Sequence, residues 1–294
     1  MRETEPDDEG RTMGVSRERA ALTCAVVAQK GGVGKTTTLL GIAGAAWERG
    51  LRTLVVDLDP QANATAALDP ASTAYTTNDV LNDSRPGVAA DAITRSGWGE
   101  GVDVIPAERA LEHRAVPEGR DSALRLRIAL EGVLDGYDVV LVDCPPSLGE
   151  LTRNALAAVR LALVVTEPSF FALPGAAAAL EAIDIVRGSN NLVLRPAGVL
   201  VNRARPQTSE HAFRLAELAE NYPDLLLPVT VPDRTALQQA QGACVPVQAW
   251  RSHGAREASE AFEDLLDLLL AAAARDVGQL GMTTTLTSTG TETR

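Results

Sequence analysis

The sequence predicts an α/β protein, a single domain built on a mostly parallel, twisted sheet with helices on both faces. Two observations support this fold class. Short apolar segments alternate with segments of helical composition over most of the 294 residues. Strands that are apolar along their length, such as VVLV at 139–142, are typical of a sheet that helices cover on both sides. Neither an internal repeat nor a linker divides the chain.

The predicted elements follow one another in the order that such a sheet requires. A first strand over 22–29 leads into a glycine-rich loop and then into a helix over 35–49, which ends at Gly50. Further strands are expected over 53–59, 102–105, 138–143, 161–166, 193–201 and 225–231. Further helices are expected over 122–134, 172–186 and 255–275.

The last of these helices carries an apolar stripe, formed by Ala258, Phe262, Leu265, Leu266 and Leu269. Its spacing predicts packing on the sheet. The polar side is acidic, whereas a helix on a membrane surface would carry Lys and Arg there. The residues on either side of the folded domain have a different composition. Clustered acids near the start predict a flexible acidic tail over 1–20, and a Thr-rich stretch with little apolar content predicts a disordered tail over 276–294. The folded domain is expected over 21–275.

Composition limits the partners that the chain can bind. Asp and Glu total 39 against 27 Lys and Arg, which gives a formal net charge of −12. Nucleic acid and anionic lipid repel such a chain on average, so that any contact with DNA requires a local basic patch. Aromatic residues make up 3% of the chain, which disfavours a stacking surface for single-stranded nucleic acid.

Two further features lead us to expect a cytoplasmic protein without integral membrane association. No apolar run approaches the roughly 18 residues of a membrane span, and the acidic N-terminus lacks the apolar core of a secretory signal. The cysteines Cys24, Cys144 and Cys244 are far apart and odd in number, which predicts reduced thiols and no disulfide framework.

The segment 29–38, QKGGVGKTTT, has the features of a phosphate-binding loop. It follows a predicted strand and opens a predicted helix, the context of a P-loop. Gly31, Gly32 and Gly34 let several backbone N–H groups point at one anion, and the helix adds the positive end of its dipole. Lys35 is expected to contact the β- and γ-phosphates, and the Thr36 hydroxyl to bind Mg²⁺. Together with the alternating strands and helices, these features favour a sheet of the P-loop NTPase type.

Carboxylates follow two of the predicted strands. Asp57 and Asp59 come at the end of the second strand, at a spacing that points both side chains the same way. One of them can orient the attacking water or hold a metal-bound water, since nucleotides bind at the carboxyl edge of such sheets. Asp143 ends the strand VVLV, the arrangement that holds Mg²⁺ directly or through water. For Asp57, the capping of a turn is an equally good interpretation.

These motifs resemble those of the ParA/MinD family of P-loop ATPases. The loop reads K-G-G-x-G-K-[ST], residues 57–65 read D-x-D-P-Q-x-N-x-T, and D-x-P-P-S begins at Asp143. The resemblance covers about 22–274. It implies that Lys30 crosses a dimer interface to the partner's nucleotide, as an arginine finger does, and that Asp59 positions the water. Lys30, Lys35 and Asp59 are thus the expected catalytic residues, and Thr36, Asp59 and Asp143 the expected metal residues. The implied contacts around the phosphates are Lys30, Gly31, Gly32, Val33, Gly34, Lys35, Thr36 and Thr37.

Looser matches concern the base and the dimer. Asn202, in the stretch GVLVNR, is similar to a family residue that hydrogen-bonds adenine, and Pro232 and Arg234 align with a segment beside adenine. The segment 166–173 looks like the family's connection between a strand and a dimer-facing helix. Ordinary core packing of its two phenylalanines is the alternative.

The surface that reads out the dimer is expected near Arg251 and Arg256, in a stretch similar to the one that supplies DNA-binding arginines in chromosome-partitioning members. Other arginines that could join the patch are Arg203, Arg205, Arg214 and Arg234. Scattered surface arginines are the alternative. The resemblance implies ATP and Mg²⁺ as cofactors, a homodimer with ATP, non-specific binding of DNA at the nucleoid, and a small ParB-like or other partner that stimulates ATP hydrolysis.

The expected function is therefore a weak ATPase that segregates or positions DNA or a protein cargo. A MinD-like membrane switch would need a basic amphipathic tail, which the Thr-rich end does not provide. A nucleotide-dependent scaffold without turnover, and an iron-protein reductase or amide-forming synthetase, are the remaining alternatives. For Cys144, a buried structural thiol is favoured over a redox or metal role.

Overall fold

The computed structural model describes residues 21–83, 85–119, 121–205 and 207–285, with side chains as far as residue 275. The segments 1–20, the whole of the predicted N-terminal tail, and 286–294, part of the predicted C-terminal tail, lie outside the described residues. The described strands are β1 (Leu22–Val27), β2 (Thr53–Asp57), β3 (Thr94–Arg95), β4 (Val102–Ile105), β5 (Val139–Asp143), β6 (Leu161–Thr166), β7 (Arg195–Ala204) and β8 (Leu226–Pro232).

These strands form one sheet in the order β3-β4-β2-β5-β1-β6-β7-β8. Neighbouring strands run parallel, except that β3 and β4 are antiparallel. The central strands β2, β5, β1 and β6 are buried along their whole length. The mostly parallel α/β sheet that the sequence predicts is confirmed.

The described α-helices are α1 (Lys35–Glu48), α2 (Asn63–Leu68), α3 (Thr77–Asn82), α4 (Arg125–Ala129), α5 (Glu150–Ala158), α6 (Ala172–Ser189), α7 (Ser209–Asn221), α8 (Thr235–Gly242) and α9 (His253–Thr285). Short 3₁₀ helices lie at Val88–Ala92, Arg109–Ala115, Ser122–Leu124, Leu134–Gly136 and Val247–Ala249.

The helices differ from the prediction in three ways. Where one helix is expected over 122–134, α4 covers only Arg125–Ala129, because Gly132 adopts a left-handed conformation with φ of 73° and breaks the helical path. The last helix continues to Thr285 instead of ending at 275, since no proline interrupts its backbone hydrogen bonds over 276–285. The sequence does not predict α2, α3, α5, α7 and α8, and four of these five have nine residues or fewer.

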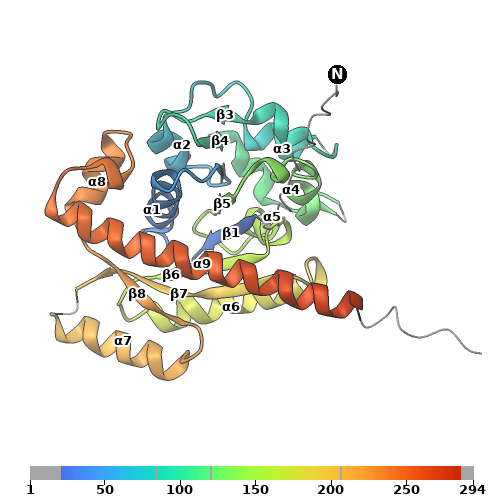
Figure 1. Ribbon diagram of the computed structural model, residues 1–294. Helices are drawn as coiled ribbons and strands as arrows, with labels where there is room; N and C mark the ends of the chain where they lie inside the picture. The colour runs from blue at the N-terminus through green and yellow to red at the C-terminus, as the bar shows by residue number, and fades with distance from the viewer. Residues whose placement is uncertain (1–20, 84, 120, 206, 286–294) are drawn as a thin grey trace, which may run out of the picture.

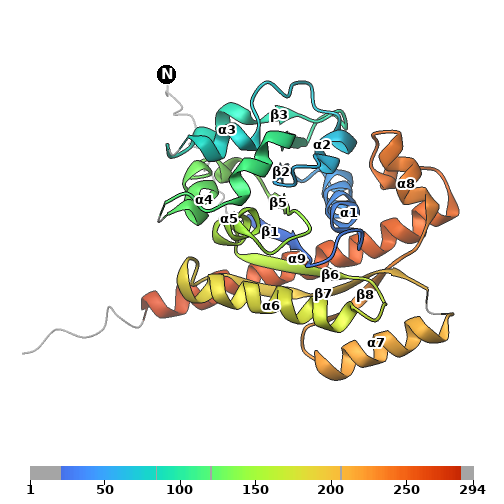
Figure 2. The same cartoon turned by 180° about the vertical axis from the view of Figure 1, so that it is seen from behind.

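Two layers of helices enclose the sheet. On one face α1 and the long α9 lie side by side, and α9 runs diagonally across the sheet (Figure 1). On the other face lie α4, α5 and α6 (Figure 2). The helix α8 closes the α1 side at one end, where it packs against the same core as α9 (Figure 1). This arrangement leaves the carboxyl ends of the central strands open beside the start of α1.

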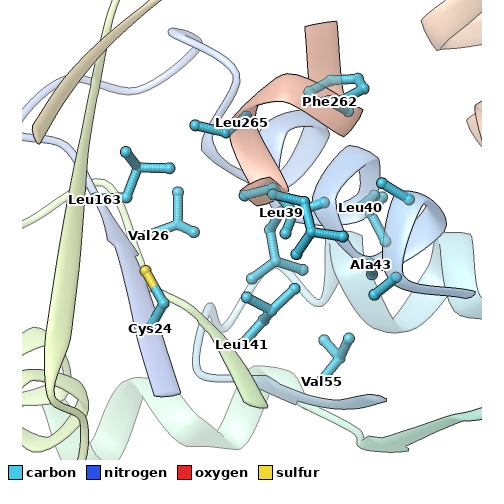
Figure 3. Packing of buried hydrophobic residues seen from close by; sticks show 14 of the residues in the cluster. Cys24, Val26, Leu39, Leu40, Ala43, Val55, Leu141, Leu163, Phe262 and Leu265 are labelled. Atoms are coloured by element: carbon cyan, nitrogen blue, oxygen red, sulfur yellow. The ribbon is translucent and has the colours of Figure 1, made fainter. Parts of the chain in front are cut away.

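The core beneath α1 and α9 shows why these helices pack so closely. Leu39, Leu40 and Ala43 of α1 lie in the same buried cluster as Phe262 and Leu265 of α9 and the apolar strand residues (Figure 3). Phe262 is fully buried. Its ring reaches the backbone of α1 at Gly41, where a Cβ atom would lie 2.3 Å from the ring. The glycine therefore makes room for the aromatic ring at the helix contact.

Candidate nucleotide-binding site

Three neighbouring strands bring the predicted motifs together at the carboxyl edge of the sheet. β1 leads into the glycine loop, and its neighbour β5 ends at Asp143, which is level with Val26 of β1. On the other side of β5, Asp57 at the end of β2 is level with Asp143. Parallel pairing in this register places the loop and both acidic segments around one site.

The backbone of the loop depends on two glycines. Gly32 and Gly34 have φ angles of 81° and 91°, a left-handed region that favours glycine. A Cβ atom at Gly34, the N-cap of α1, would lie 1.9 Å from Nδ2 of Asn202. That nitrogen donates a hydrogen bond of 2.8 Å to the carbonyl of Val33. Asn202 thus holds the loop from β7. The contact with adenine that the resemblance implies for this residue remains a prediction.

Lys35 and Thr36 open α1 directly behind the loop. The Lys35 side chain is buried, with 6% of the residue exposed, and it lines the same cavity as Thr36. The Thr36 hydroxyl donates a hydrogen bond of 2.7 Å to Oδ2 of Asp143. Burial raises the pKa of Asp143 well above its usual value, and the neighbouring Asp57 raises it further, whereas Thr36 and Lys35 lower it.

These groups fit a magnesium ion bound together with phosphate. The second oxygen of Asp143, Oδ1, is buried and has no hydrogen-bond partner among the described residues, which is costly for a carboxylate. Mg²⁺ prefers oxygen ligands and binds through one or two carboxylates together with phosphates and water. The Thr36 hydroxyl and the carboxylates of Asp143 and Asp59 are the groups that would hold it.

The two carboxylates of the second motif have different surroundings, contrary to the expectation that both point the same way. β2 ends at Asp57, so that the alternation of a strand does not extend to Asp59. Asp57 is fully buried and accepts hydrogen bonds from the Asp59 amide at 3.0 Å, and from the Thr65 amide and hydroxyl at 2.8 and 2.7 Å. Burial raises its pKa to about 6. Asp57 therefore anchors the segment that leads into α2, whereas Asp59 lines the cavity.

The glycine loop and the segment 57–65 line a cavity of about 620 Å³, within the range of small-molecule sites. Among the described residues that line this cavity, seven are residues that the sequence predicts to contact phosphate, metal or water: Gly31, Gly32, Gly34, Lys35, Thr36, Thr37 and Asp59. Asn202 and Asp143 lie directly behind this lining, where they contact Val33 and Thr36. The structure thus brings together most of the predicted phosphate and metal residues.

The residues predicted beside adenine lie elsewhere. Pro232 ends β8, and neither it nor Arg234 belongs to the described lining of the cavity. Arg234 donates a hydrogen bond of 2.6 Å to Glu257 in a separate hollow of about 410 Å³, which Ser252 and His253 also line. An adenine contact by Pro232 and Arg234 remains a prediction.

The predicted surface residues are exposed. Lys30 lies beside the loop with 49% of its side chain exposed, and its ammonium pairs with Glu167 at 3.0 Å. Phe170 and Phe171 are 68% and 59% exposed. The alternative interpretation, in which these two rings pack in the core, is therefore wrong.

The arginines considered for binding DNA differ in their partners. Arg251 and Arg256 are exposed and form no ion pair with a described residue. The other arginines considered for the patch pair with carboxylates, Arg203 with Glu167, Arg205 with Asp233, Arg214 with Glu210 and Glu217, and Arg234 with Glu257.

The far wall of the cavity is not predicted from the sequence. Gln241 and Gly242, at the end of α8, and Cys244, just beyond it, line this wall, and Nε2 of Gln241 donates a hydrogen bond of 3.1 Å to the Thr37 hydroxyl. Arg203, at the end of β7, also lines it, with a left-handed φ of 54°. Gly242 signals a helix end, but no local pattern connects it with a loop about 200 residues earlier.

Comparisons with known proteins agree with this geometry. Residues 21–195 match the family model of the AAA domain. The sporulation initiation inhibitor protein Soj of Bacillus subtilis is 34% identical over 240 residues, which cover 79% of this chain and 92% of that protein. The chromosome partitioning protein ParA of Caulobacter vibrioides is 34% identical over 229 residues, which cover 76% of this chain and 85% of that protein.

A solved structure is similar as well. Cobyrinic acid a,c-diamide synthase from Mycobacterium smegmatis, with bound ADP and magnesium, superposes with a TM-score of 0.69 at 31% identity, covering 84% of this chain and 93% of that one. The family match covers more than half of the chain, and the Soj and ParA proteins align with most of it. Together with the glycine loop and its two acidic segments, these matches show that this chain belongs to the ParA/MinD family of P-loop ATPases.

Proposed function

We propose that this protein is an ATPase of the ParA type, which binds ATP with Mg²⁺, forms a homodimer in the ATP state and hydrolyses ATP slowly. The observation that carries the proposal is the hydrogen bond of 2.7 Å between Thr36 and Asp143, beside the buried Lys35. It joins the phosphate loop to the carboxylate of β5 at the point where a phosphate-bound cation would lie.

Each group in the site has a defined part in this proposal. The N–H groups of the loop and the start of α1 bind the phosphates, and Lys35 neutralises their charge. The chemistry that Mg²⁺ supplies when bound is neutralisation of charge on the β- and γ-phosphates. Asp59 orients the attacking water, and Lys30 contacts the nucleotide of the other protomer. After hydrolysis of ATP, the two protomers of the dimer separate.

The cargo side of the proposal rests on the relatives and on the exposed arginines. Two similar proteins are a sporulation initiation inhibitor and a chromosome partitioning protein. We propose that the ATP dimer binds DNA without sequence preference through Arg251 and Arg256, on the nucleoid in the cytoplasm. A small ParB-like or other partner stimulates hydrolysis, and the cycle segregates or positions DNA or a protein cargo.

Two alternatives have less support. A MinD-like positioning ATPase would bind a membrane surface through a basic amphipathic helix, whereas the polar side of α9 is mainly acidic. No helix in the described part of the chain has the length and apolarity of a membrane span. An amide-forming synthase is suggested by one similar structure. Burial raises the pKa of the Cys24 thiol to about 12 and that of Cys144 well above its usual value, so that a reactive thiolate could come only from the third cysteine, Cys244, which lines the cavity.

Nucleotide binding by Lys35→Ala tests the proposed site. Titration with a fluorescent ATP analogue in Mg²⁺ is expected to show an affinity lowered by about 10- to 100-fold or more, because a charge-assisted hydrogen bond to phosphate is removed. The matched control is Arg187→Ala, which removes one positive charge from the exposed end of α6, and it should bind like the wild type. Tight binding retained by Lys35→Ala would refute the assignment of residues 29–38 as the cradle that binds the phosphates.

A further inference from the structure

An ion pair outside the cavity holds the residue on which the proposed dimer depends. The Lys30 ammonium lies 3.0 Å from Oε1 of Glu167, in the connection between β6 and α6. The second carboxylate oxygen of Glu167 lies 3.9 Å from the guanidinium of Arg203, which lines the cavity. A single carboxylate thus serves two cations at the mouth of the nucleotide site.

The same connection contacts Lys30 a second time. Its ammonium lies 5.4 Å from the centroid of the Phe171 ring, within the range of a cation–π contact. Phe171 in turn packs edge to face against Phe170 at 5.3 Å. Both rings are largely exposed. In the free protomer Lys30 is therefore turned onto its own surface by a carboxylate and a ring from one segment.

We infer that Glu167 is an autoinhibitory latch, which holds Lys30 in its own protomer and opposes the exchange of that lysine into the site of a second copy. The inference rests on the proposed function, in which Lys30 contacts the partner's nucleotide. An ammonium paired in cis cannot at the same time lie against a phosphate of another protomer. Formation of the dimer therefore requires that each protomer break its Lys30–Glu167 pair.

The symmetry of the dimer amplifies this effect. An ion pair exposed to solvent shifts an equilibrium by only about 1.4- to 5-fold. A two-fold symmetric dimer breaks two such pairs, so that the dissociation constant changes by the square of that factor, about 2- to 25-fold. The latch thus sets the protein concentration at which ATP produces dimers, whereas the cradle around Lys35 is unchanged.

The sequence offers a direct probe of the latch. Lys30 and Lys35 are the only lysines of the chain, and Lys35 is buried. Acylation of the nucleotide-free protein with an amine reagent, followed by peptide mass spectrometry, therefore reports on Lys30. In Glu167→Gln the Lys30 amine should react faster than in the wild type, since its carboxylate partner is gone.

The decisive experiment measures dimer formation by sedimentation velocity, over a range of protein concentrations, with Mg²⁺ and a non-hydrolysable ATP analogue. Glu167→Gln is expected to dimerise at a concentration about 2- to 25-fold lower than the wild type. Removal of any negative charge favours association of acidic protomers. The matched control is therefore Asp267→Asn, which removes a carboxylate that pairs with Arg49 beyond the opposite end of α1.

The outcomes separate the latch from the proposed function. A larger shift in Glu167→Gln than in Asp267→Asn, together with faster acylation of Lys30, supports the latch. If the wild type dimerises and the two variants shift equally, or if acylation of Lys30 is unchanged, the latch is wrong and the ATP dimer stands. If the wild type forms no dimer at any concentration, the proposed dimer fails, and the role given to Glu167 fails with it.

Discussion

Lys30 and Lys35 stand out among the basic residues, because every other cationic side chain of the chain is an arginine or a histidine. Many of the arginines pair with carboxylates across the surface, as Arg49 does with Glu263 and Arg214 with Glu210. A guanidinium suits the fork of a carboxylate, whereas an ammonium is a compact point charge on a flexible stem. The chain thus places its two ammonium groups where the proposed function needs mobile or buried charge next to phosphate.

Asp59 and Asp57 can be separated by substitution. Asp59→Ala is expected to bind ATP and accumulate dimer, with turnover lowered by about 10²- to 10⁴-fold, because the side chain that positions water is removed. Phosphate release under steady-state conditions measures the turnover, and sedimentation velocity with ATP measures the dimer. Turnover by Asp59→Ala equal to that of the wild type would assign water positioning to another group.

The substitution Asp57→Asn should instead lower the thermal stability of the protein, because Asp57 holds Thr65 through two hydrogen bonds.

At the scale of elements, the contact between α1 and α9 depends on Gly41. Gly41→Ala is expected to destabilise the protein by about 1–3 kcal/mol, because the added methyl group meets the buried ring of Phe262 and overpacks the core. The control is Gly188→Ala in α6, where no atom lies within 4 Å of the added Cβ, and where alanine should stabilise the helix by about 0.5–1 kcal/mol. Urea unfolding of both variants measures the difference. Equal stabilities would show that α9 can shift away from α1.

The accuracy of the sequence predictions follows the physical signal of each element. Strands β4 and β6 have the predicted bounds. An apolar run between Arg160 and Glu167 marks both ends of β6, and Gly101 and Pro106 flank β4. The glycine loop is predicted because phosphate binding fixes the spacing of its glycines and Lys35, and Asp143 is predicted because it directly follows an apolar strand. The opposite wall, formed by α8, cannot be predicted in this way, because its position depends on tertiary packing. The orientation of Asp57 also escapes prediction, since it depends on where β2 ends and α2 begins.

At the scale of the whole molecule, the net charge of −12 sets the condition for binding DNA. Four candidate arginines are already paired with carboxylates, which leaves Arg251 and Arg256 as exposed cations beside the start of α9. Binding through so few charges is weak and sensitive to salt. The ATP dimer is expected to bind DNA more strongly than the protein with ADP does, since the dimer contains Arg251 and Arg256 from both protomers.

Co-sedimentation with DNA at several salt concentrations tests this surface. The double variant Arg251→Ala and Arg256→Ala should bind more weakly than the wild type with ATP, and the slope of log K against log salt should flatten by about 1 for each phosphate that is no longer neutralised. The control Arg187→Ala removes a paired arginine from the opposite face and should leave the slope unchanged. An unchanged slope in the double variant would exclude these arginines as phosphate ligands.

The hydrogen bond from Asn202 to the carbonyl of Val33 connects the phosphate-binding loop to β7, which lies two strands away from β1 in the sheet. When a loop becomes ordered only on binding, the lost conformational entropy costs about 1–2 kcal/mol of free energy for each residue. This loop is preorganised by a side chain that the ligand does not supply, so that little of this loss accompanies binding. The cradle should then accept the phosphates of ATP and ADP almost alike, and the discrimination between them falls to the groups at its rim.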